Sequence, residues 1–127
     1  MQDRPTASEL LEALSAFMRD RAENARDRWE RFQFQVASNS LAIIRREIEI
    51  GGELMREEWR GLDALLGEET MPAESAALSS QLLARNDELS DRIRSGEFDG
   101  EAEDALLAHL WTTVVNKVRI ASPNEIS

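Results

Sequence analysis

Helical periodicity is the feature of this sequence that most constrains its fold. Apolar residues recur at spacings of three and four along almost the whole chain, and the strict alternation of a half-buried strand is almost absent. The pattern predicts an all-α protein, a bundle of about five helices with an antiparallel up-and-down core. A chain of 127 residues is long enough to bury a core without disulfides or metal, so we expect one domain over 1–127.

The first helix is predicted to begin at Thr6, because "TASE" has the form of a capping box in which Thr6 and Glu9 cap each other's backbone N–H groups. A turn near Asn24 separates it from the second helix, which Asp27 supports in its first turn. Five apolar residues of the first helix share one face that we expect to be buried: Leu10, Leu11, Leu14, Phe17 and Met18.

Glycines are predicted to end the next three helices, since a left-handed residue commonly stops a helix. The second helix ends at Gly51 or Gly52, a third over 53–66 ends at Gly67, and a fourth over about 72–95 ends at Gly96. The second helix has a broad apolar arc, which we expect to be central in the bundle. Its members are Trp29, Phe32, Val36, Ile43 and Ile50, extended by Ala37, Leu41, Ile44 and Ile48.

The fifth helix is predicted to start after Asp99 and to end near Ala121, before Pro123. It holds the only histidine, His109, and the only lysine, Lys117. On a helical wheel the apolar residues from Leu106 to Val118 lie opposite His109, which we therefore expect to project away from the core. His109, Thr113 and Asn116 form a stripe that suits a polar ligand, but a solvated polar face explains the same spacing with fewer assumptions.

Polar residues of the second helix have two interpretations. Asn39, at the edge of the apolar arc, is either a hydrogen-bonding partner of a neighbouring backbone or a group that points into a pocket. Arg45 and Arg46, with Arg28 and Arg31, are predicted to share an outer face. Arginine suits phosphates and carboxylates, so this face either binds such a group or is simply solvated.

The charge distribution disfavours several partners. The formal net charge is −10, whereas a nucleic-acid binder concentrates positive charge; we expect no nucleic acid and no membrane surface as partners. Residues 1–50 hold 8 Arg and 9 Asp or Glu, which gives a net charge of −1, and the remaining residues carry −9. With no cysteine, no apolar run of membrane-spanning length and no secretory leader pattern, a cytoplasmic location is expected.

The sequence identifies no catalytic residues, no metal ligands and no cofactor. One histidine cannot supply the paired Glu-x-x-His motifs of a di-iron bundle, and the chain lacks a phosphate-binding glycine loop and a nucleophile elbow. The candidates for binding a ligand or a partner are therefore polar and charged residues of two helices: Asn39, Arg45, Arg46, His109, Asn116 and Lys117.

Four segments carry a resemblance over the whole chain: "RPTASELLEAL" at 4–14, "FQFQVASNSLAIIRREIEI" at 32–50, "RIRSGEFD" at 92–99 and "HLWTTVVNKVRIASPNEI" at 109–126. In these the chain resembles an uncharacterised family of short bacterial helical proteins, classed as a domain of unknown function. Its members are often encoded beside aminoglycoside-phosphotransferase-like kinases and acyl-CoA dehydrogenases. The resemblance implies an accessory role near acyl-CoA metabolism and supplies no catalytic residues. The family's Asn-Pro-aromatic ending is replaced here by Ser122 and Pro123 in "SPNEI".

Two hypotheses follow from different classes of protein. The first is a non-catalytic helical interaction module, a homodimer or the partner of a kinase-like enzyme or acyl-CoA dehydrogenase, because a small bundle does not cover two broad apolar arcs alone. The second is a bundle that binds, or acts on, a phosphorylated or acyl-CoA-type ligand. It would place Asn39, Arg46, His109 and Lys117 around one pocket, since groups that share a reaction must meet within hydrogen-bond reach.

Overall fold

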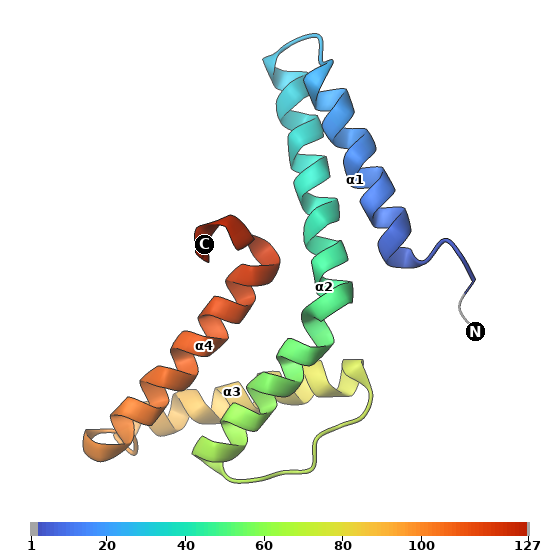
Figure 1. The fold of residues 1–127 in the computed structure, drawn as a ribbon. Helices are drawn as coiled ribbons and strands as arrows, with labels where there is room; N and C mark the ends of the chain where they lie inside the picture. The colour runs from blue at the N-terminus through green and yellow to red at the C-terminus, as the bar shows by residue number, and fades with distance from the viewer. Residues whose placement is uncertain (1–2, 127) are drawn as a thin grey trace. The chain divides into compact units, whose positions relative to one another are not determined.

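A computed structural model describes residues 3–126, and helices dominate it (Figure 1). Within this range the helices are α1 (Ala7–Glu23), α2 (Arg28–Leu66), α3 (Ser75–Arg94) and α4 (Glu103–Ala121), with short 3-10 helices η1 (Gly100–Ala102) and η2 (Pro123–Ile126). No strand occurs among these residues. The all-α class is confirmed, and the expectation of about five helices is wrong, because the described residues form four α-helices.

Most helix ends that side chains or proline specify locally lie where the sequence predicts them. The start of the fifth helix is the exception, because Asp99 makes no capping hydrogen bond and α4 begins only at Glu103, after η1. Thr6 Oγ1 accepts from the Glu9 backbone N–H at 3.1 Å, and Glu9 Oε1 accepts from the Thr6 N–H at 3.2 Å, which completes the capping box of α1. Asp27 Oδ1 accepts from the Glu30 N–H at 2.9 Å ahead of α2. The turn near Asn24 is therefore real, and α1 and α2 are separate helices.

Gly51 and Gly52 do not end a helix. Both lie inside α2, a helix of 39 residues, and neither has the positive φ that Gly67, Gly96 and Gly100 adopt. A glycine inside a helix costs only about 1 kcal/mol relative to alanine, and good helix formers surround this pair. The predicted second and third helices are thus one helix.

The chain divides into two compact units, and α2 contributes to both. The first unit contains residues 1–51 and 120–122, and the second contains residues 52–119 and 123–127. Each is described separately below, and the prediction of a single domain over 1–127 stays a prediction.

The first unit is built on the antiparallel pair formed by α1 and the start of α2 (Figure 1). Its buried side chains are small: Ser15 and Ala22 from α1, and Ser38 from α2. Ser15 Oγ donates to the Ser38 carbonyl at 3.0 Å, and Ser38 Oγ donates to the Ser15 carbonyl at the same distance. Small residues with reciprocal hydrogen bonds therefore hold this pair of helices together.

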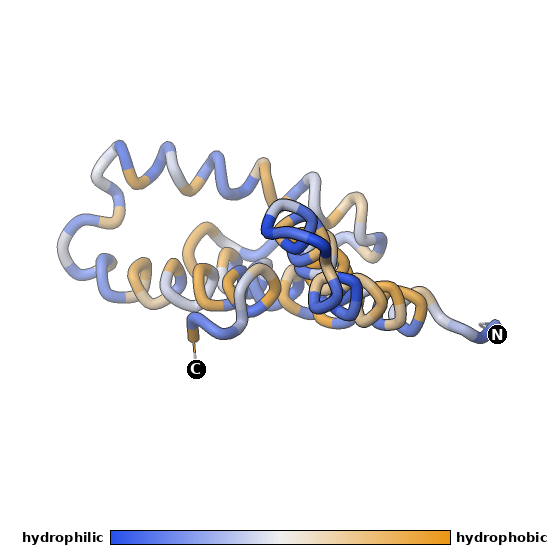
Figure 2. Tube along the Cα trace, turned by 90° about the horizontal axis from the view of Figure 1, so that it is seen from above, coloured by the Kyte–Doolittle hydropathy of each residue, from blue (hydrophilic) through white to orange (hydrophobic). Residues whose placement is uncertain are grey.

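The apolar residues of this pair are not its buried face. Leu10, Leu14 and Phe17 of α1, and Trp29, Phe32 and Val36 of α2, are exposed to about half or more of their area. The predicted burial of these residues is wrong, because periodicity shows which side chains share a face and not which face a neighbouring helix covers. Figure 2 shows how hydrophobic and hydrophilic residues follow one another along the helices.

The second unit holds the main hydrophobic core. Trp59 and Leu62 of α2 are 1% and 0% exposed, and the other buried residues of their cluster come from α3, the turn after it and α4. The full buried cluster is Trp59, Leu62, Leu78, Leu82, Leu89, Phe98 and Leu106. The helical spacing of Trp59 and Leu62, and of Leu78, Leu82 and Leu89, thus corresponds to buried faces, whereas Ile93 of α3 is exposed.

The fifth predicted helix, α4, turns its polar side inward. Leu106 is buried at 6% exposed, and His109, Thr113 and Asn116 are half-buried. On the opposite side Leu107, Trp111 and Val114 are exposed, Trp111 to 71%. The prediction that His109 projects away from the core is wrong, because α4 packs through Leu106 and a row of small and polar residues instead of its apolar arc.

Candidate functional site

His109 lines a hollow of about 320 Å³ in the second unit. Residues of α2 form one wall, and residues of α4 form the other. Of the residues predicted from sequence, the hollow includes His109 and Asn116. Its lining is Glu57, Glu58, Gly61, Ala64, Leu65, Ala105, Ala108, His109, Thr112, Thr113 and Asn116.

Gly61 is the reason that the histidine fits there. A Cβ atom built on Gly61 would lie 2.3 Å from His109 Nδ1 and 2.6 Å from Cε1, far inside van der Waals contact. The imidazole therefore lies against the backbone of α2 at the one residue in that turn without a side chain. The sequence signal was available as a glycine inside a helix, which often marks a close packing contact.

The electrostatics of the hollow are acidic. Glu58 is largely buried and accepts from Asn86 Nδ2 at 3.2 Å. Lys117 Nζ lies 3.9 Å from Glu58 Oε1, with most of its side chain in solvent. Partial burial lowers the pKa of His109 below its ordinary value of 6.5, and the negative charge of Glu58 opposes that shift. A neutral imidazole beside two glutamates suits a neutral or cationic group better than a phosphate.

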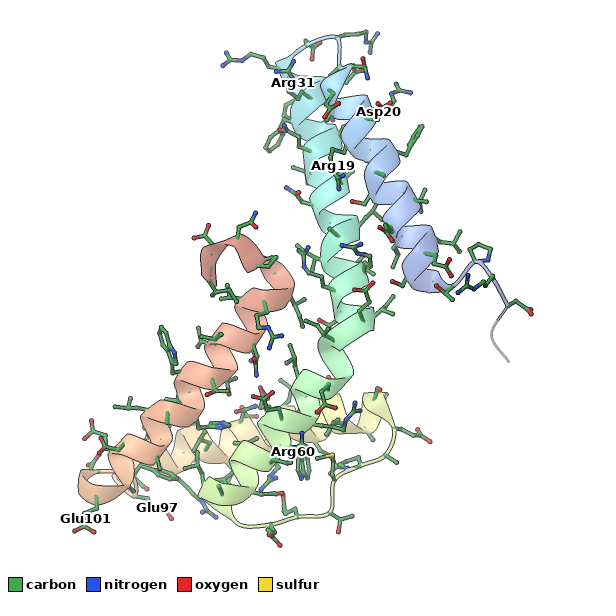
Figure 3. All side chains as sticks on the ribbon, viewed as in Figure 1. Arg19, Asp20, Arg31, Arg60, Glu97 and Glu101 are labelled. Atoms are coloured by element: carbon green, nitrogen blue, oxygen red, sulfur yellow. The ribbon has the colours of Figure 1, made fainter. Side chains whose placement is uncertain are left out.

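Asn39 and Arg46 lie in the first unit. Asn39 is exposed and lines a second hollow with Arg19, Gln35 and Ser38; Arg19 is labelled in Figure 3. Arg46 is half-buried, and its Nε donates to the Ile120 carbonyl at 2.6 Å. The structure thus groups the predicted residues by unit, with Asn39 and Arg46 in the first and His109, Asn116 and Lys117 in the second.

Arg45 points toward α1 rather than toward solvent. Its Nη1 lies 3.7 Å from Glu12 Oε1, and the two residues line a third hollow with Ser15, Ala16 and Arg19. The Nε of Arg45 is buried and has no hydrogen-bond partner among the described residues. The predicted outer face of arginines is therefore wrong for Arg45. This arginine-lined hollow, not the histidine hollow, has the charge that an anionic ligand requires.

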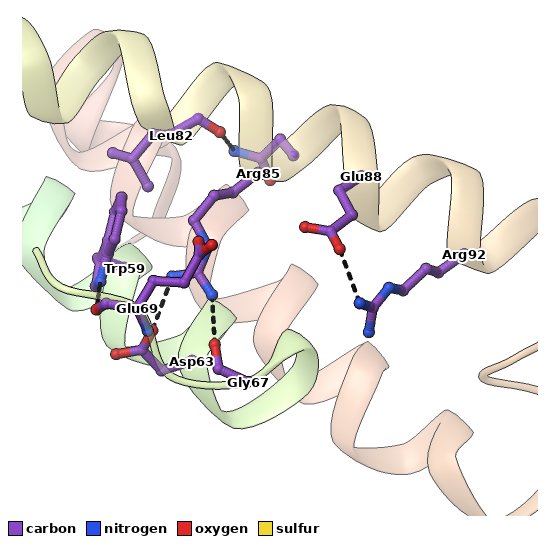
Figure 4. A network of polar contacts seen from close by, with 9 residues as sticks. Trp59, Asp63, Gly67, Glu69, Leu82, Arg85, Glu88 and Arg92 are labelled. Carbon is purple, nitrogen blue, oxygen red and sulfur yellow. Dashed lines mark hydrogen bonds and ion pairs between the residues drawn. The ribbon is translucent and has the colours of Figure 1, made fainter.

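A buried polar network surrounds Arg85, a residue that the sequence pattern did not identify (Figure 4). Arg85 is 4% exposed; Nη1 donates to Asp63 Oδ1 at 2.8 Å, and Nη2 donates to the Gly67 carbonyl at 2.7 Å. Its Nε lies 2.9 Å from Glu69 Oε2, an ion pair without hydrogen-bond geometry.

The same guanidinium stacks over Trp59, with its Cζ 4.5 Å from the ring centroid. Trp59 Nε1 in turn donates to the Glu69 carbonyl at 3.2 Å. These contacts tie the segment after α2 onto the core, because Gly67 and Glu69 both lie in it. The only available signal was an arginine at a core-spaced position between Leu82 and Leu89. Since every contact of Arg85 is internal, its role is structural.

Two exposed apolar surfaces stand out from these polar sites. We call the exposed apolar side of α4 the α4 surface, formed by Leu107, Leu110, Trp111 and Val114. We call the exposed apolar side of the first unit the hairpin face, formed by Leu10, Leu14, Phe17, Ile44 and Ile48. Contiguous exposed apolar patches mark interaction sites more often than isolated exposed residues do.

Neither a group of metal ligands nor a membrane-spanning helix is found among residues 3–126. They contain no group of three or more histidine, aspartate or glutamate side chains that is arranged to hold a metal ion. In the same range, no helix is long and apolar enough to cross a bilayer.

Fold and surfaces together define an all-α protein whose most distinctive feature is exposed apolar surface. A family model, Domain of unknown function (DUF6285), matches residues 24–125, which is most of the chain. The chain belongs to this family, which confirms its resemblance to an uncharacterised domain. No curated protein and no solved structure matches it.

Proposed function

We propose that this chain is a non-catalytic helical interaction module that holds a protein partner against the α4 surface. The observation that supports this most directly is the orientation of α4, which directs Trp111 and its apolar neighbours outward. Burying an indole at the centre of an interface commonly contributes most of the binding energy. A helix whose only function was to complete a core would place this side chain inside.

The net charge of the half of the chain that carries the α4 surface indicates the kind of partner. Residues 51–127 carry a net charge of −9, with 7 Arg or Lys against 16 Asp or Glu. Two copies of such a surface repel one another, whereas a partner with a basic rim is attracted to it. We therefore propose a different protein as the occupant of this surface.

The family resemblance suggests which enzymes to test. We propose a bacterial, cytoplasmic accessory role beside a kinase-like enzyme or an acyl-CoA dehydrogenase. In this role the chain contributes a binding surface, and its enzyme partner contributes the chemistry.

Calorimetry tests the proposal by measuring whether this chain binds a purified kinase-like enzyme or acyl-CoA dehydrogenase that is encoded beside it. Wild type is expected to bind, and Trp111→Glu is expected to raise Kd at least about tenfold. Leu14→Glu, an equivalent change on the hairpin face, is the matched control and is expected to bind like wild type. Equal Kd values for wild type and the Trp111→Glu variant would show that the α4 surface does not bind the enzyme.

A second function, small-ligand binding, is favoured by the hollow that brings His109 and Asn116 together. The acidic lining makes a neutral or cationic ligand the better fit there, and the arginine-lined hollow of the first unit is the better fit for a phosphorylated or acyl-CoA-type ligand. A thermal-shift screen tests both, because a ligand that binds the native state raises Tm. CoA esters and nucleotides are expected to raise Tm by binding at Arg45, and small amines are expected to raise Tm by binding at His109.

A further inference from the structure

We infer that the hairpin face binds a second copy of this chain, and that two antiparallel α1–α2 pairs form a four-helix bundle in the dimer. This inference concerns the first unit and a homotypic partner, so it stands apart from the proposed role of the α4 surface. It rests on three properties of the hairpin face: its continuity across two helices, its charge and its area.

The hairpin face is continuous because its residues lie on the same side of both helices. Ser15 and Ser38 face each other across the pair. Each residue of a helix is turned by about 100° around the helix axis from the one before it. Counted in one direction around the axis of α1, Leu10, Leu14 and Phe17 lie between roughly 100° and 160° from Ser15. Ile44 and Ile48 lie roughly 80° to 120° from Ser38 in the same sense. In antiparallel helices the same sense of rotation leads to the same side of the pair.

A side-chain contact between the two helices supports this placement independently. The Arg21 guanidinium lies over the Phe34 ring, with Cζ 5.2 Å from the ring centroid. Arg21 falls within the angular range of the α1 residues, and Phe34 falls on the corresponding side of α2. Because these two side chains meet across the pair, the residues beside them share one surface.

The charge of the first unit allows a second copy to approach. Residues 1–51 carry eight arginines and nine acidic residues, a net charge of −1, and residues 120–122 are uncharged. Between Ala7 and Met18 on α1, and between Phe34 and Ile48 on α2, the one charged position on the side of the hairpin face is Arg45, which lies at its inner edge and pairs with Glu12 of α1. The apolar positions on this side are Ala7, Leu10, Leu11, Leu14, Phe17 and Met18 with Phe34, Ala37, Leu41, Ile44 and Ile48. Depletion of charge at the centre is the compositional mark of protein interfaces.

The area of the hairpin face reaches the minimum expected of a biological interface. The 17 residues of α1 extend about 26 Å at 1.5 Å per residue, and two helices side by side are about 20 Å wide. The face therefore offers roughly 500 Å² per copy before its corrugation is counted. If the whole face is covered in both copies, the dimer buries about 1,000 Å² in total, which is the lower limit for a biological interface.

The internal packing of the first unit gives a reason for association. Its described buried side chains are only Ser15, Ala22 and Ser38, and small side chains bury little apolar area. A second copy would bury Leu10, Leu14 and Phe17 against Ile44 and Ile48. Because the same surface serves both copies, the interface is self-complementary and closes at two chains.

Light scattering coupled to size-exclusion chromatography tests this inference on the full chain. Wild type is expected to have twice the mass of one chain, and Tm is expected to rise with protein concentration, because dimerisation stabilises the native state. Leu14→Glu and Ile44→Glu are each expected to raise the dimer Kd at least about tenfold. Both positions are exposed, and circular dichroism checks that the variants remain helical.

Val114→Glu on the α4 surface is the matched control and is expected to remain dimeric. A wild-type monomer with a concentration-independent Tm would overturn the inference, as would dimers of the Leu14→Glu and Ile44→Glu variants as stable as those of wild type. A dimer disrupted by Val114→Glu alone would also overturn it, since the α4 surface would then be the homotypic interface. Loss of enzyme binding by Trp111→Glu with an unchanged dimer would leave both proposals standing.

Discussion

Arg85 shows how a single charged side chain stabilises the second unit. It is almost fully buried, and three groups that it contacts, Asp63, Gly67 and Glu69, lie in or next to the segment after α2. Arg94, on the same helix, pairs with Asp91 where both side chains are 76% exposed. Exposed pairs contribute little, whereas removing one partner of a buried network leaves desolvated groups unpaired.

We expect Arg85→Ala to lower the free energy of unfolding by about 1.5–3 kcal/mol, the range for hydrogen bonds to charged groups. Arg94→Ala is the control and should cost less than about 0.5 kcal/mol. Urea unfolding followed by circular dichroism measures both. Equal effects of the two substitutions would mean that the Arg85 network does not carry the stability assigned to it.

His109 makes stability depend on pH. Burial keeps its pKa below the ordinary 6.5 in the folded chain, so the unfolded chain binds a proton first as the pH falls. The contribution of the neutral imidazole is therefore fully present above pH 6.5 and is lost as the pH falls below that value.

We expect the unfolding free energy of wild type to decrease when the pH is lowered from about one unit above this value to about one unit below. His109→Asn retains a polar side chain that does not titrate, so its decrease over the same range should be smaller. Identical pH profiles would show that the imidazole is not held in the hollow.

At the scale of elements, two glycines of α2 have opposite roles. A Cβ on Gly61 would collide with the His109 ring, whereas a Cβ on Gly52 would meet only the Arg56 guanidinium, at 3.5 Å. Gly61 therefore permits a close helix contact, and Gly52 is a position where alanine fits.

Gly52→Ala is expected to stabilise the chain by about 1 kcal/mol through helix propensity. Gly61→Ala is expected to destabilise it by about 1–3 kcal/mol through overpacking. Combining Gly61→Ala with His109→Ala should recover part of the loss, because the colliding ring is removed. If Gly61→Ala stabilised the chain as Gly52→Ala does, the close contact would be absent.

The elements also show how far sequence reasoning reaches. Local sequence signals located several helix ends, because the residues that specify these ends affect only the backbone next to them. These residues are Thr6 with Glu9, Asn24, Gly96 and Pro123. Gly51 and Gly52 were misread because a glycine permits a helix end without requiring one. The inner faces of α1 and α4 were misread because Ser15 and His109 pack against Ser38 and Gly61, and such pairings depend on residues distant in sequence.

The candidate sites likewise include residues that a local pattern identifies and residues that only the folded chain brings together. The sequence pattern identified His109 and Asn116 as members of one stripe, and the structure places both at one hollow. The sequence pattern does not identify Arg85, since its partners Asp63 and Glu69 come from another part of the chain. Unpaired charge, close glycine contacts and exposed apolar faces are properties of the assembled units, which periodicity alone does not report.

At the scale of the whole molecule, the two units differ in charge and in the surface that each exposes. The nearly neutral first unit has the hairpin face, and the acidic second unit has the α4 surface. On this division we base both proposals, self-association through the first unit and a different protein partner for the second. An interaction module needs its binding surface free when the partner is absent, so the exposure of α4 is the central claim.

Thiol labelling of single-cysteine variants tests that claim most directly, because the chain contains no cysteine. In the purified chain without any partner, the V114C thiol is expected to react within about threefold of E103C, an exposed position on the same helix. The A22C thiol, at a position that is 3% exposed, is the protected reference. A V114C thiol as slow as A22C would show that the apolar side of α4 is already covered, and it would contradict the account.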